Sequence, residues 1–232
     1  ILQHFNVKNM SKNDYIHLFC EAVKIGYFLR DQYLADAHYN KLSVTSFLSK
    51  KSLEQYASKI NLKKAKIYEK SNFPDHPDTI YLTVRDKNGM TISFINSLFD
   101  PFGSGITAPR SGVLFHCRGR GFNLIEGHPN ELSPNKRPLH TIIPAMVSNK
   151  NKLIGSFGVM GGQYQAAGHA YVLSQMIDFG LSPQEALDLP RVFPNSNFLD
   201  FEKNFDNSII EDMISRGHKI NYPVSPIGGG QI

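Results

Sequence analysis

Apolar residues recur at three- and four-residue steps in the first part of the chain, a spacing that predicts helices. Ser11 and Asp14 form a capping box for the first helix, whose apolar face carries Tyr15, Leu18, Phe19, Ala22, Val23 and Gly26. A second helix is predicted over about 50–60, with Ser49 as its N-cap and an apolar face of Leu53, Tyr56, Ala57 and Ile60. The first part of the chain is therefore predicted to form a helical lobe.

After Asp78 the apolar period changes to two, which is typical of strands. Segments 79–85 and 90–99 flank the turn Asp86-Lys87-Asn88-Gly89 and predict a hairpin. The same pattern predicts further strands, at 112–117, 141–147, 153–159, 198–201 and 218–222. The second half of the chain is therefore expected to carry most of the sheet.

Helix signals return after the strands. Gly161-Gly162 leads into a predicted helix at 166–179 that Gly180 closes, and Ser182-Pro183-Gln184-Glu185 opens another with the residues of a capping box. A last helix is expected at 208–216, ended by Gly217. Helices on both sides of a strand block predict an α+β fold with largely antiparallel sheets.

Composition indicates a folded core and excludes several classes of protein. The chain has 232 residues, of which 41% are hydrophobic and 19% charged, enough to bury a substantial core. Its net charge of +5 is spread along the chain, and the single RGG-like segment 118–121 is too little to predict a nucleic-acid partner. Cys20 and Cys117 lie far apart and indicate neither a disulfide framework nor a zinc site.

No cofactor is predicted. Gly103-Ser104-Gly105 lacks the third glycine and the helix of a dinucleotide fingerprint, and His76, His116, His128 and His140 have no metal-ligand spacing. No apolar stretch approaches the roughly 18 residues of a membrane span. The chain begins in mid-pattern at Ile1, so we expect a fragment of something longer. The compartment stays open, with the cytoplasm favoured over export.

The chemistry centres on Thr79, which follows the breaker-rich segment 72–78 and opens a strand. A threonine there is by itself only a good β-former. A threonine with a free α-amino group, however, carries its own base and can act as a nucleophile. Ser97 offers a second hydroxyl, and Gly161-Gly162 is either a steric necessity of a strand-to-helix turn or a pair of oxyanion donors.

Ten short motifs in this order resemble those of the γ-glutamyltransferase (glutathione hydrolase) family of N-terminal-nucleophile hydrolases. They lie at 21–24, 30–31, 78–79, 102–105, 134–138, 161–162, 178–181, 185–186, 190–191 and 216–218. The resemblance implies a four-layer αββα sandwich and a proenzyme that cleaves itself between Asp78 and Thr79. Residues 1–78 would be the C-terminal, mostly helical part of the large-subunit region, and 79–232 the small-subunit region. Partners would be the remainder of the large subunit and, in a homo-oligomer, further copies.

The resemblance also implies roles for single residues. Thr79 would attack a γ-glutamyl or related amide, Gly161 and Gly162 would form the oxyanion hole, and Ser97 would lie beside the nucleophile's amine. An α-amino group has a pKa of about 7.7–8.0, so near neutral pH it can accept the hydroxyl proton. His140 and Thr141 occupy the position of paired serines that contact the substrate carboxylate.

One departure from the family concerns the substrate pocket. Arg118 and Gly121 stand where the family has a Gln or Glu and, three residues later, an acidic residue that together bind the substrate α-amine, and Phe99 replaces a common asparagine. Arg118 instead suits an acyl group that ends in a carboxylate, as in glutaryl- or cephalosporin-type acylases. The remaining alternative is an unprocessed, non-catalytic relative that acts as a binding protein.

Overall fold

The computed structural model describes residues 1–40, 43–68 and 78–232. The chain forms two compact units whose segments alternate along the sequence. The first unit comprises Ile1–Asn72, Phe122–Leu139 and Pro190–Ser225, and the second comprises Phe73–Gly121, His140–Leu189 and Pro226–Ile232. Residues 72–77 of the predicted loop 72–78, with His76, lie outside the described residues, and Asp78 already belongs to strand β1. The predicted division at Asp78-Thr79 concerns processing and stays a prediction.

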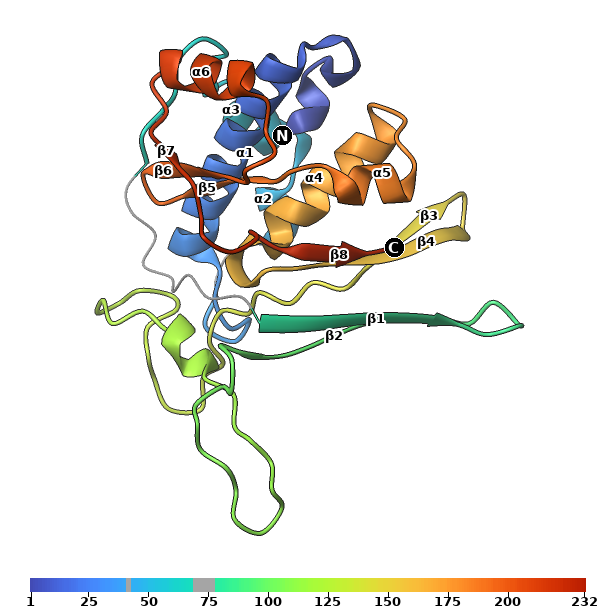
Figure 1. The fold of residues 1–232 in the computed structure, drawn as a ribbon. Coiled ribbons are helices and arrows are strands. Elements are labelled where there is room, and N and C mark those ends of the chain that lie inside the picture. The colour runs from blue at the N-terminus through green and yellow to red at the C-terminus, as the bar shows by residue number, and fades with distance from the viewer. Residues whose placement is uncertain (41–42, 69–77) are drawn as a thin grey trace. The chain divides into compact units, whose positions relative to one another are not determined.

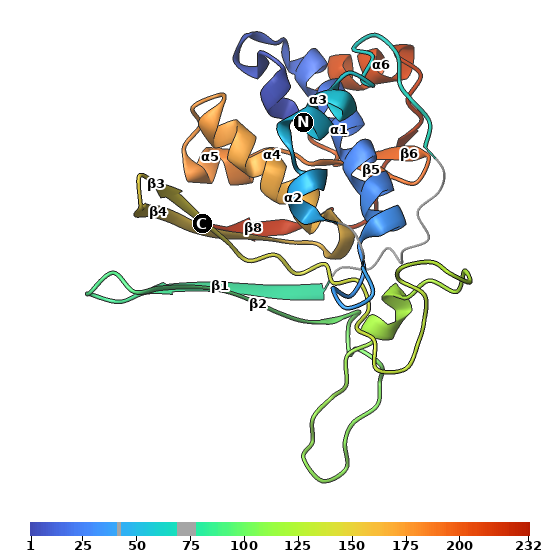
Figure 2. The same cartoon turned by 180° about the vertical axis from the view of Figure 1, so that it is seen from behind.

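The first unit is built around one long helix, as the periodicity predicts. Helix α1 begins where Ser11 Oγ accepts a hydrogen bond from Asp14 N, and its buried residues include Leu18 and Phe19. It packs against β5 and α6, and Figure 2 shows it beside β5. The elements of this unit are η1 Leu2–His4, η2 Val7–Asn9, α1 Lys12–Tyr33, α2 Val44–Phe47, α3 Lys50–Ala57, β5 Val192–Asn195, β6 Phe198–Phe201, α6 Asn207–Ser215 and β7 Ile220–Asn221.

The second unit is layered. Strands β3, β4 and β8 form an antiparallel sheet; helix α4 covers one face of it and the antiparallel hairpin β1–β2 packs on the other (Figure 1). The elements are β1 Asp78–Arg85, β2 Thr91–Phe99, η3 Arg118–Gly121, β3 Ala145–Asn149, β4 Lys152–Met160, η4 Gly162–Tyr164, α4 Gln165–Ile177, α5 Pro183–Asp188 and β8 Gly229–Gln231. This succession of helix, sheet and sheet supplies three of the four expected layers.

Strand β4 is the inner strand of the three-stranded sheet, and its residues 156–159 are buried on both faces. Phe157 lies 4.9 Å, between ring centroids, from His169 of α4. On the other face Gly158 has no room for a side chain, because a Cβ there would lie 2.2 Å from the ring of Tyr81. Burial on both sides explains why residues 156–159 lack the alternation that the first part of β4 shows.

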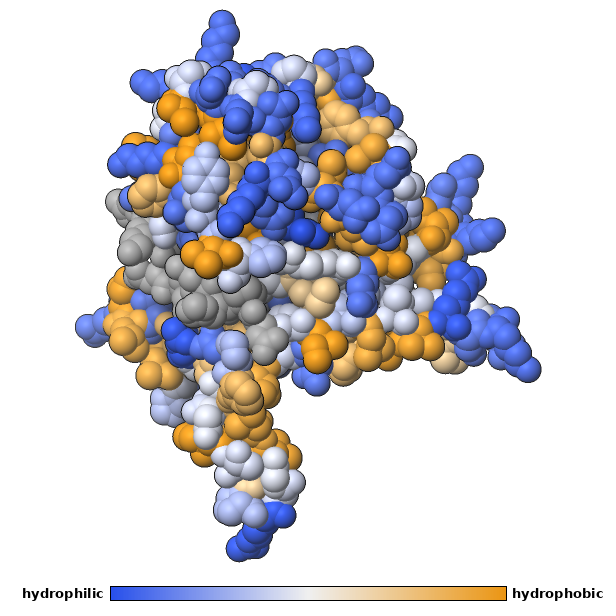
Figure 3. Space-filling view, in the orientation of Figure 1, coloured by the Kyte–Doolittle hydropathy of each residue, from blue (hydrophilic) through white to orange (hydrophobic). Residues whose placement is uncertain are grey.

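The hairpin β1–β2 buries only one of its faces. Tyr81 and Ile95 are cross-strand partners that point inward and are 2% and 7% exposed. The opposite face carries apolar side chains that are all exposed, and Figure 3 shows apolar colouring along this hairpin: Ile80, Leu82, Val84, Ile92 and Phe94. An exposed apolar face of this kind is typical of a surface that packs against another layer or a partner.

Several predicted elements need correction. The strand expected at 112–117 is wrong: this segment meets 104–108 in an irregular loop with one bridge, Thr107 to Leu114, because glycines and Pro109 interrupt a ladder there. The strand expected at 141–147 begins only at Ala145, since Pro144 cannot donate to the sheet. That expected at 218–222 is reduced to Ile220–Asn221, and β5, β8 and α2 were not predicted.

In the part of the chain that the structure describes, no helix has both the length and the apolar content needed to span a membrane.

Candidate active site

Thr79 lies near the start of β1 and faces the same side of the hairpin as Tyr81. Its side chain is half-buried, and Gln165 Nε2 donates a long hydrogen bond of 3.4 Å to Thr79 Oγ1. Gln165 is the first residue of α4 and is itself 1% exposed. The fold therefore places the predicted nucleophile at the beginning of a buried helix that comes directly after Gly161-Gly162.

The strand pairing is irregular at Thr79. Asp78 pairs with Phe99 and Ile80 pairs with Asn96, so one residue of β1 is opposite two residues of β2, Ser97 and Leu98. Bulges of this kind are over-represented next to active sites because they redirect a side chain. Ser97, the predicted second hydroxyl, thus lies across the ladder from Thr79, and its Oγ accepts a hydrogen bond of 2.9 Å from Phe99 N.

Phe99 adopts a backbone conformation that aromatic residues rarely take. Its φ is 84°, and its side chain is 4% exposed. Such a conformation costs on the order of 1–3 kcal/mol and persists only where the surrounding structure imposes it. The strain lies directly opposite Asp78, at the bond that we expect to be cleaved.

Gly161 and Gly162 form the turn between β4 and η4. Gly161 has a φ of 138° and a Cβ on it would lie 2.7 Å from Ile227 O, so both conformation and space require glycine. Gly162 also has a positive φ, of 52°, and both glycines are buried. Lack of space therefore explains Gly161, backbone conformation favours glycine at 162, and the role of the pair as oxyanion donors stays a prediction.

The predicted substrate-binding residues form a second group. Arg118 in η3 is 5% exposed, its Nη1 donates to Thr141 Oγ1 over 3.4 Å, and its guanidinium carbon lies 5.4 Å from the ring centroid of Phe99. Burial lowers the pKa of Arg118. Burial also lowers the pKa of His140, and the positive charge of Arg118 adds to this effect. The three residues named from the sequence, Arg118, His140 and Thr141, are thus brought together.

Phe99 links the two groups. It pairs with Asp78 in the ladder and its ring lies beneath Arg118. Gly121 is buried at the end of η3. The sequence singled out most members of both groups, but neither Gln165 nor the strained backbone that joins the groups.

Three contributors were not predicted. Gln165 could have been found, because it opens the helix that follows the glycine pair. Tyr81 and Ser156 gave no sequence signal, since their hydroxyls meet only in the fold, 2.9 Å apart. Thr83 Oγ1 donates to the same Ser156 Oγ over 2.9 Å, so hydroxyl groups connect β1 to β4 on the face that carries Thr79.

A different polar cluster is buried in the first unit. His17 Nδ1 lies 2.8 Å from His218 Nε2, His17 Nε2 lies 2.9 Å from Asn61 O, and Lys24 Nζ lies 3.2 Å from His218 Nδ1. A carbonyl only accepts and an ammonium only donates, which fixes both tautomers: Lys24 donates to His218, His218 to His17, and His17 to Asn61. Burial is the main cause that lowers the pKa of both histidines, to about 3 for His218.

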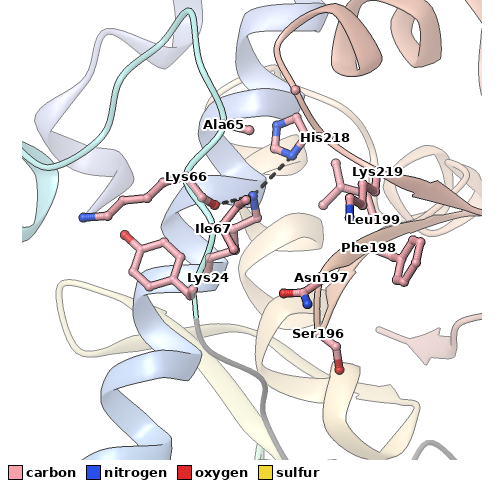
Figure 4. A pocket seen from close by; sticks show the side chains of 12 residues that line it. Lys24, Ala65, Lys66, Ile67, Ser196, Asn197, Phe198, Leu199, His218 and Lys219 are labelled. Atoms are coloured by element: carbon pink, nitrogen blue, oxygen red, sulfur yellow. Dashed lines mark hydrogen bonds between the residues drawn. The ribbon is translucent and has the colours of Figure 1, made fainter.

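Lys24 and His218 also line a pocket of about 90 Å³, with Ser196, Asn197 and Lys219 on its other side (Figure 4). The ammonium of Lys24 does not reach freely into this space. Its three protons go to Glu21 Oε1 at 2.7 Å, to Lys66 O at 3.1 Å and to His218. Lys24 is therefore a structural residue and not an available nucleophile.

His17, Glu21 and His218 offer ligand atoms within 4.8 Å of one another, so they were considered as a metal site. The chain already supplies a positive charge there, because the Lys24 ammonium contacts both Glu21 and His218. A divalent cation would have to displace it. We therefore assign this cluster to the core of the first unit and propose no metal for it.

The layers of the second unit, with Thr79 near the start of β1, are those of an N-terminal-nucleophile hydrolase fold. The chain belongs to the gamma-glutamyltranspeptidase family, whose model matches residues 1–232. It is 33% identical over 213 residues to the glutathione hydrolase-like YwrD proenzyme of Bacillus subtilis, a match that covers 89% of this chain and 40% of that protein. It is 29% identical to the oxamate amidohydrolase proenzyme of Klebsiella pneumoniae, over 88% of this chain and 40% of that protein.

Solved structures agree with this assignment. A cephalosporin acylase from Bacillus halodurans matches with a TM-score of 0.86 and 34% identity, over 97% of this chain and 42% of that one. A γ-glutamyltranspeptidase from Pseudomonas nitroreducens, complexed with L-DON, matches in fold with a TM-score of 0.60 and 20% identity, over 65% of this chain and 86% of that one. The chain spans 40% of the length of the two curated relatives named above.

Proposed function

We propose that this chain carries the catalytic threonine of a self-processing amidohydrolase or acyltransferase, with Thr79 as the nucleophile. The observation that supports the proposal best is the hydrogen bond between Gln165 and Thr79 Oγ1, because it joins the hydroxyl to the segment that begins with Gly161-Gly162. The family supplies the class of reaction, and relatives named hydrolase, amidohydrolase and acylase all cleave or transfer at an amide.

The first step would be processing. Thr79 Oγ1 attacks the carbonyl carbon of Asp78, the peptide bond shifts to an ester, and water hydrolyses the ester. The products are an Asp78 carboxylate and a free α-amine on Thr79. Because the α-amine exists only after cleavage, the precursor lacks the base that the mature enzyme uses.

The second step would be acyl transfer. The α-amine accepts the Oγ1 proton while Oγ1 attacks the amide carbon of a γ-glutamyl or related substrate. The N–H groups of Gly161 and Gly162 would stabilise the tetrahedral oxyanion, where one donor is worth about 2.7–4 kcal/mol. The leaving amine takes the proton and departs. Water, or the amine of an amino acid or peptide, then attacks the acyl-enzyme ester and regenerates the hydroxyl.

Replacing the nucleophile tests the proposal. In the full-length protein we expect Thr79→Ala to leave one band on a denaturing gel and to abolish amide turnover, whereas the wild type gives a fragment whose mass begins at Thr79. Thr79→Ser keeps a hydroxyl and should still process, more slowly. Thr83→Ala is a matched control, because it removes a hydroxyl from the same face of β1 without removing the nucleophile.

Two outcomes would contradict the proposal. If Thr79→Ala still matures and turns over an amide, the nucleophile is another residue. If the wild-type protein stays intact for days and is inactive, the non-catalytic binding relative is the better description.

A further inference from the structure

Arg118 is a buried cation whose hydrogen bonds are incomplete. Its residue is 5% exposed, and within the described part of the chain its buried Nη2 atom has no hydrogen-bond partner. Nη1 has only the long contact of 3.4 Å with Thr141 Oγ1. A guanidinium that is both buried and unsatisfied is expensive, so a structure that keeps one is expected to use it for a ligand.

Among the described residues, no acidic side chain forms an ion pair with Arg118. A phenyl ring lies beneath it, Cys117 is an ionisable neighbour, and the charges of Arg118 and His116 both act on His140. The carboxylate of Asp100 is already bound by Arg120. A guanidinium binds a carboxylate through paired N–H groups. An anion with two coplanar oxygen atoms would therefore supply the acceptors that Arg118 lacks.

The position of Arg118 connects this anion to the reacting bond. Its guanidinium lies over Phe99, and Phe99 is the ladder partner of Asp78, the neighbour of Thr79. An ammonium at the same place would face a buried cation. A substrate with a carboxylate and without an amine near Arg118 is therefore favoured over one with an α-amine.

We propose that Arg118 and Thr141 form a carboxylate-binding subsite, and that the substrates of this protein are amides of short dicarboxylic acids that carry no α-amine. The proposal rests on the function proposed above for the identity of the reacting bond. Binding at Arg118 does not depend on it, and this allows the two to be tested separately.

The matched substrates are glutaramate and L-glutamine, which differ by one ammonium group. In the full-length processed protein we expect kcat/KM to be at least 10-fold higher for glutaramate, and Arg118→Met to lower the ratio of glutaramate to butyramide turnover by about 10- to 100-fold, mainly through KM. Arg120→Met removes the same charge two residues away, at a side chain that is 51% exposed, and should leave the ratio unchanged.

Binding without turnover separates the two proposals. We expect calorimetry to detect glutaramate on full-length Thr79→Ala protein and to lose it on Thr79→Ala with Arg118→Met. If this binding depends on Arg118 but the wild type shows no turnover, the proposed function fails and the subsite stands.

Other results would overturn the carboxylate subsite. If the wild type processes and turns over L-glutamine as well as glutaramate, or if Arg118→Met changes nothing, the subsite is wrong and the function stands. Failure of glutaramate to bind, together with marked destabilisation by Arg118→Met, would show that Arg118 pairs with an acidic group of the protein itself, and this too would overturn the subsite.

Discussion

The two compact units each bury a cation, and the two cations are held very differently. In the first unit the Lys24 side chain is 13% exposed and donates all three protons, to a carboxylate, a carbonyl and an imidazole. In the second unit Arg118 is 5% exposed, has one long hydrogen bond and leaves Nη2 without a partner among the described residues. The exposed fractions alone do not reveal this difference in hydrogen-bond partners.

The difference shows how a charged side chain that only stabilises the fold can be distinguished from one that binds a ligand. A buried ion is tolerated when its partners are complete, and the network around Lys24 then fixes α1 against the segment that carries His218. A buried ion with an open donor keeps part of its desolvation cost until a ligand supplies the acceptor. The predictions below measure that contrast, beginning with the largest effect.

Removing the satisfied cation should be costly. Lys24→Met leaves the Glu21 carboxylate, 1% exposed, without its ion-pair partner, and we expect a loss of about 3–5 kcal/mol in the free energy of unfolding. Urea unfolding of the full-length protein measures this loss from the shift in midpoint. Lys64→Met, at an exposed lysine of the same unit, is the control and should cost less than about 0.5 kcal/mol. Equal midpoints for both variants would mean that the network is not structural.

Acid should weaken the same network, because its histidines resist protonation in the fold. The pKa of His218 in the fold, about 3, lies below its ordinary value of 6.5. As the pH falls below about 6.5, the unfolded chain therefore binds a proton that the folded chain does not bind. Stability is therefore full above that pH and declines toward the folded pKa, by about 1.4 kcal/mol per pH unit for each such proton. Lys24, Arg216 and His17 all face His218 and oppose its protonation.

The measurement is the urea midpoint at several pH values between 7 and 5. His218→Gln removes the titrating group while keeping polar atoms in place, so its midpoint should depend less steeply on pH than that of the wild type. Parallel slopes for the two proteins would assign the acid sensitivity to another group.

Removing the unsatisfied cation should cost little. Arg118→Met takes an uncompensated charge out of the interior, and we expect the free energy of unfolding to change by less than about 1 kcal/mol or to rise, even though carboxylate binding is lost. Thermal unfolding with and without glutaramate measures both effects on one sample. A destabilisation as large as that of Lys24→Met would remove the contrast between the two units.

Elements with local signals could be predicted from the sequence. The caps at Ser11, Ser49 and Ser182 and the turn before Met90 are set by residues a few positions apart, and the structure confirms these helices and the hairpin. The short strand β8 has no such signal, because Gly229–Gln231 becomes a strand only by pairing with β4.

The same distinction applies to the functional residues. Motifs indicated Thr79, Arg118 and Thr141, but whether Arg118 is satisfied depends on burial, which no local pattern contains. His17 and His218 are 201 residues apart, and their contact requires the finished fold. Phe99 was noticed only as a substitution, since a positive φ is a property of the folded backbone.

The interleaving of the two units has a consequence for the cut chain. Helix α1 lies before Asp78-Thr79 in sequence, whereas β5 and α6, which pack against it, lie after. Cleavage at that bond would therefore convert the core of the first unit into an interface between two polypeptides, without moving any of its residues. The two pieces would be an obligate heterodimer from the moment of their formation, and neither could dissociate without unfolding the other.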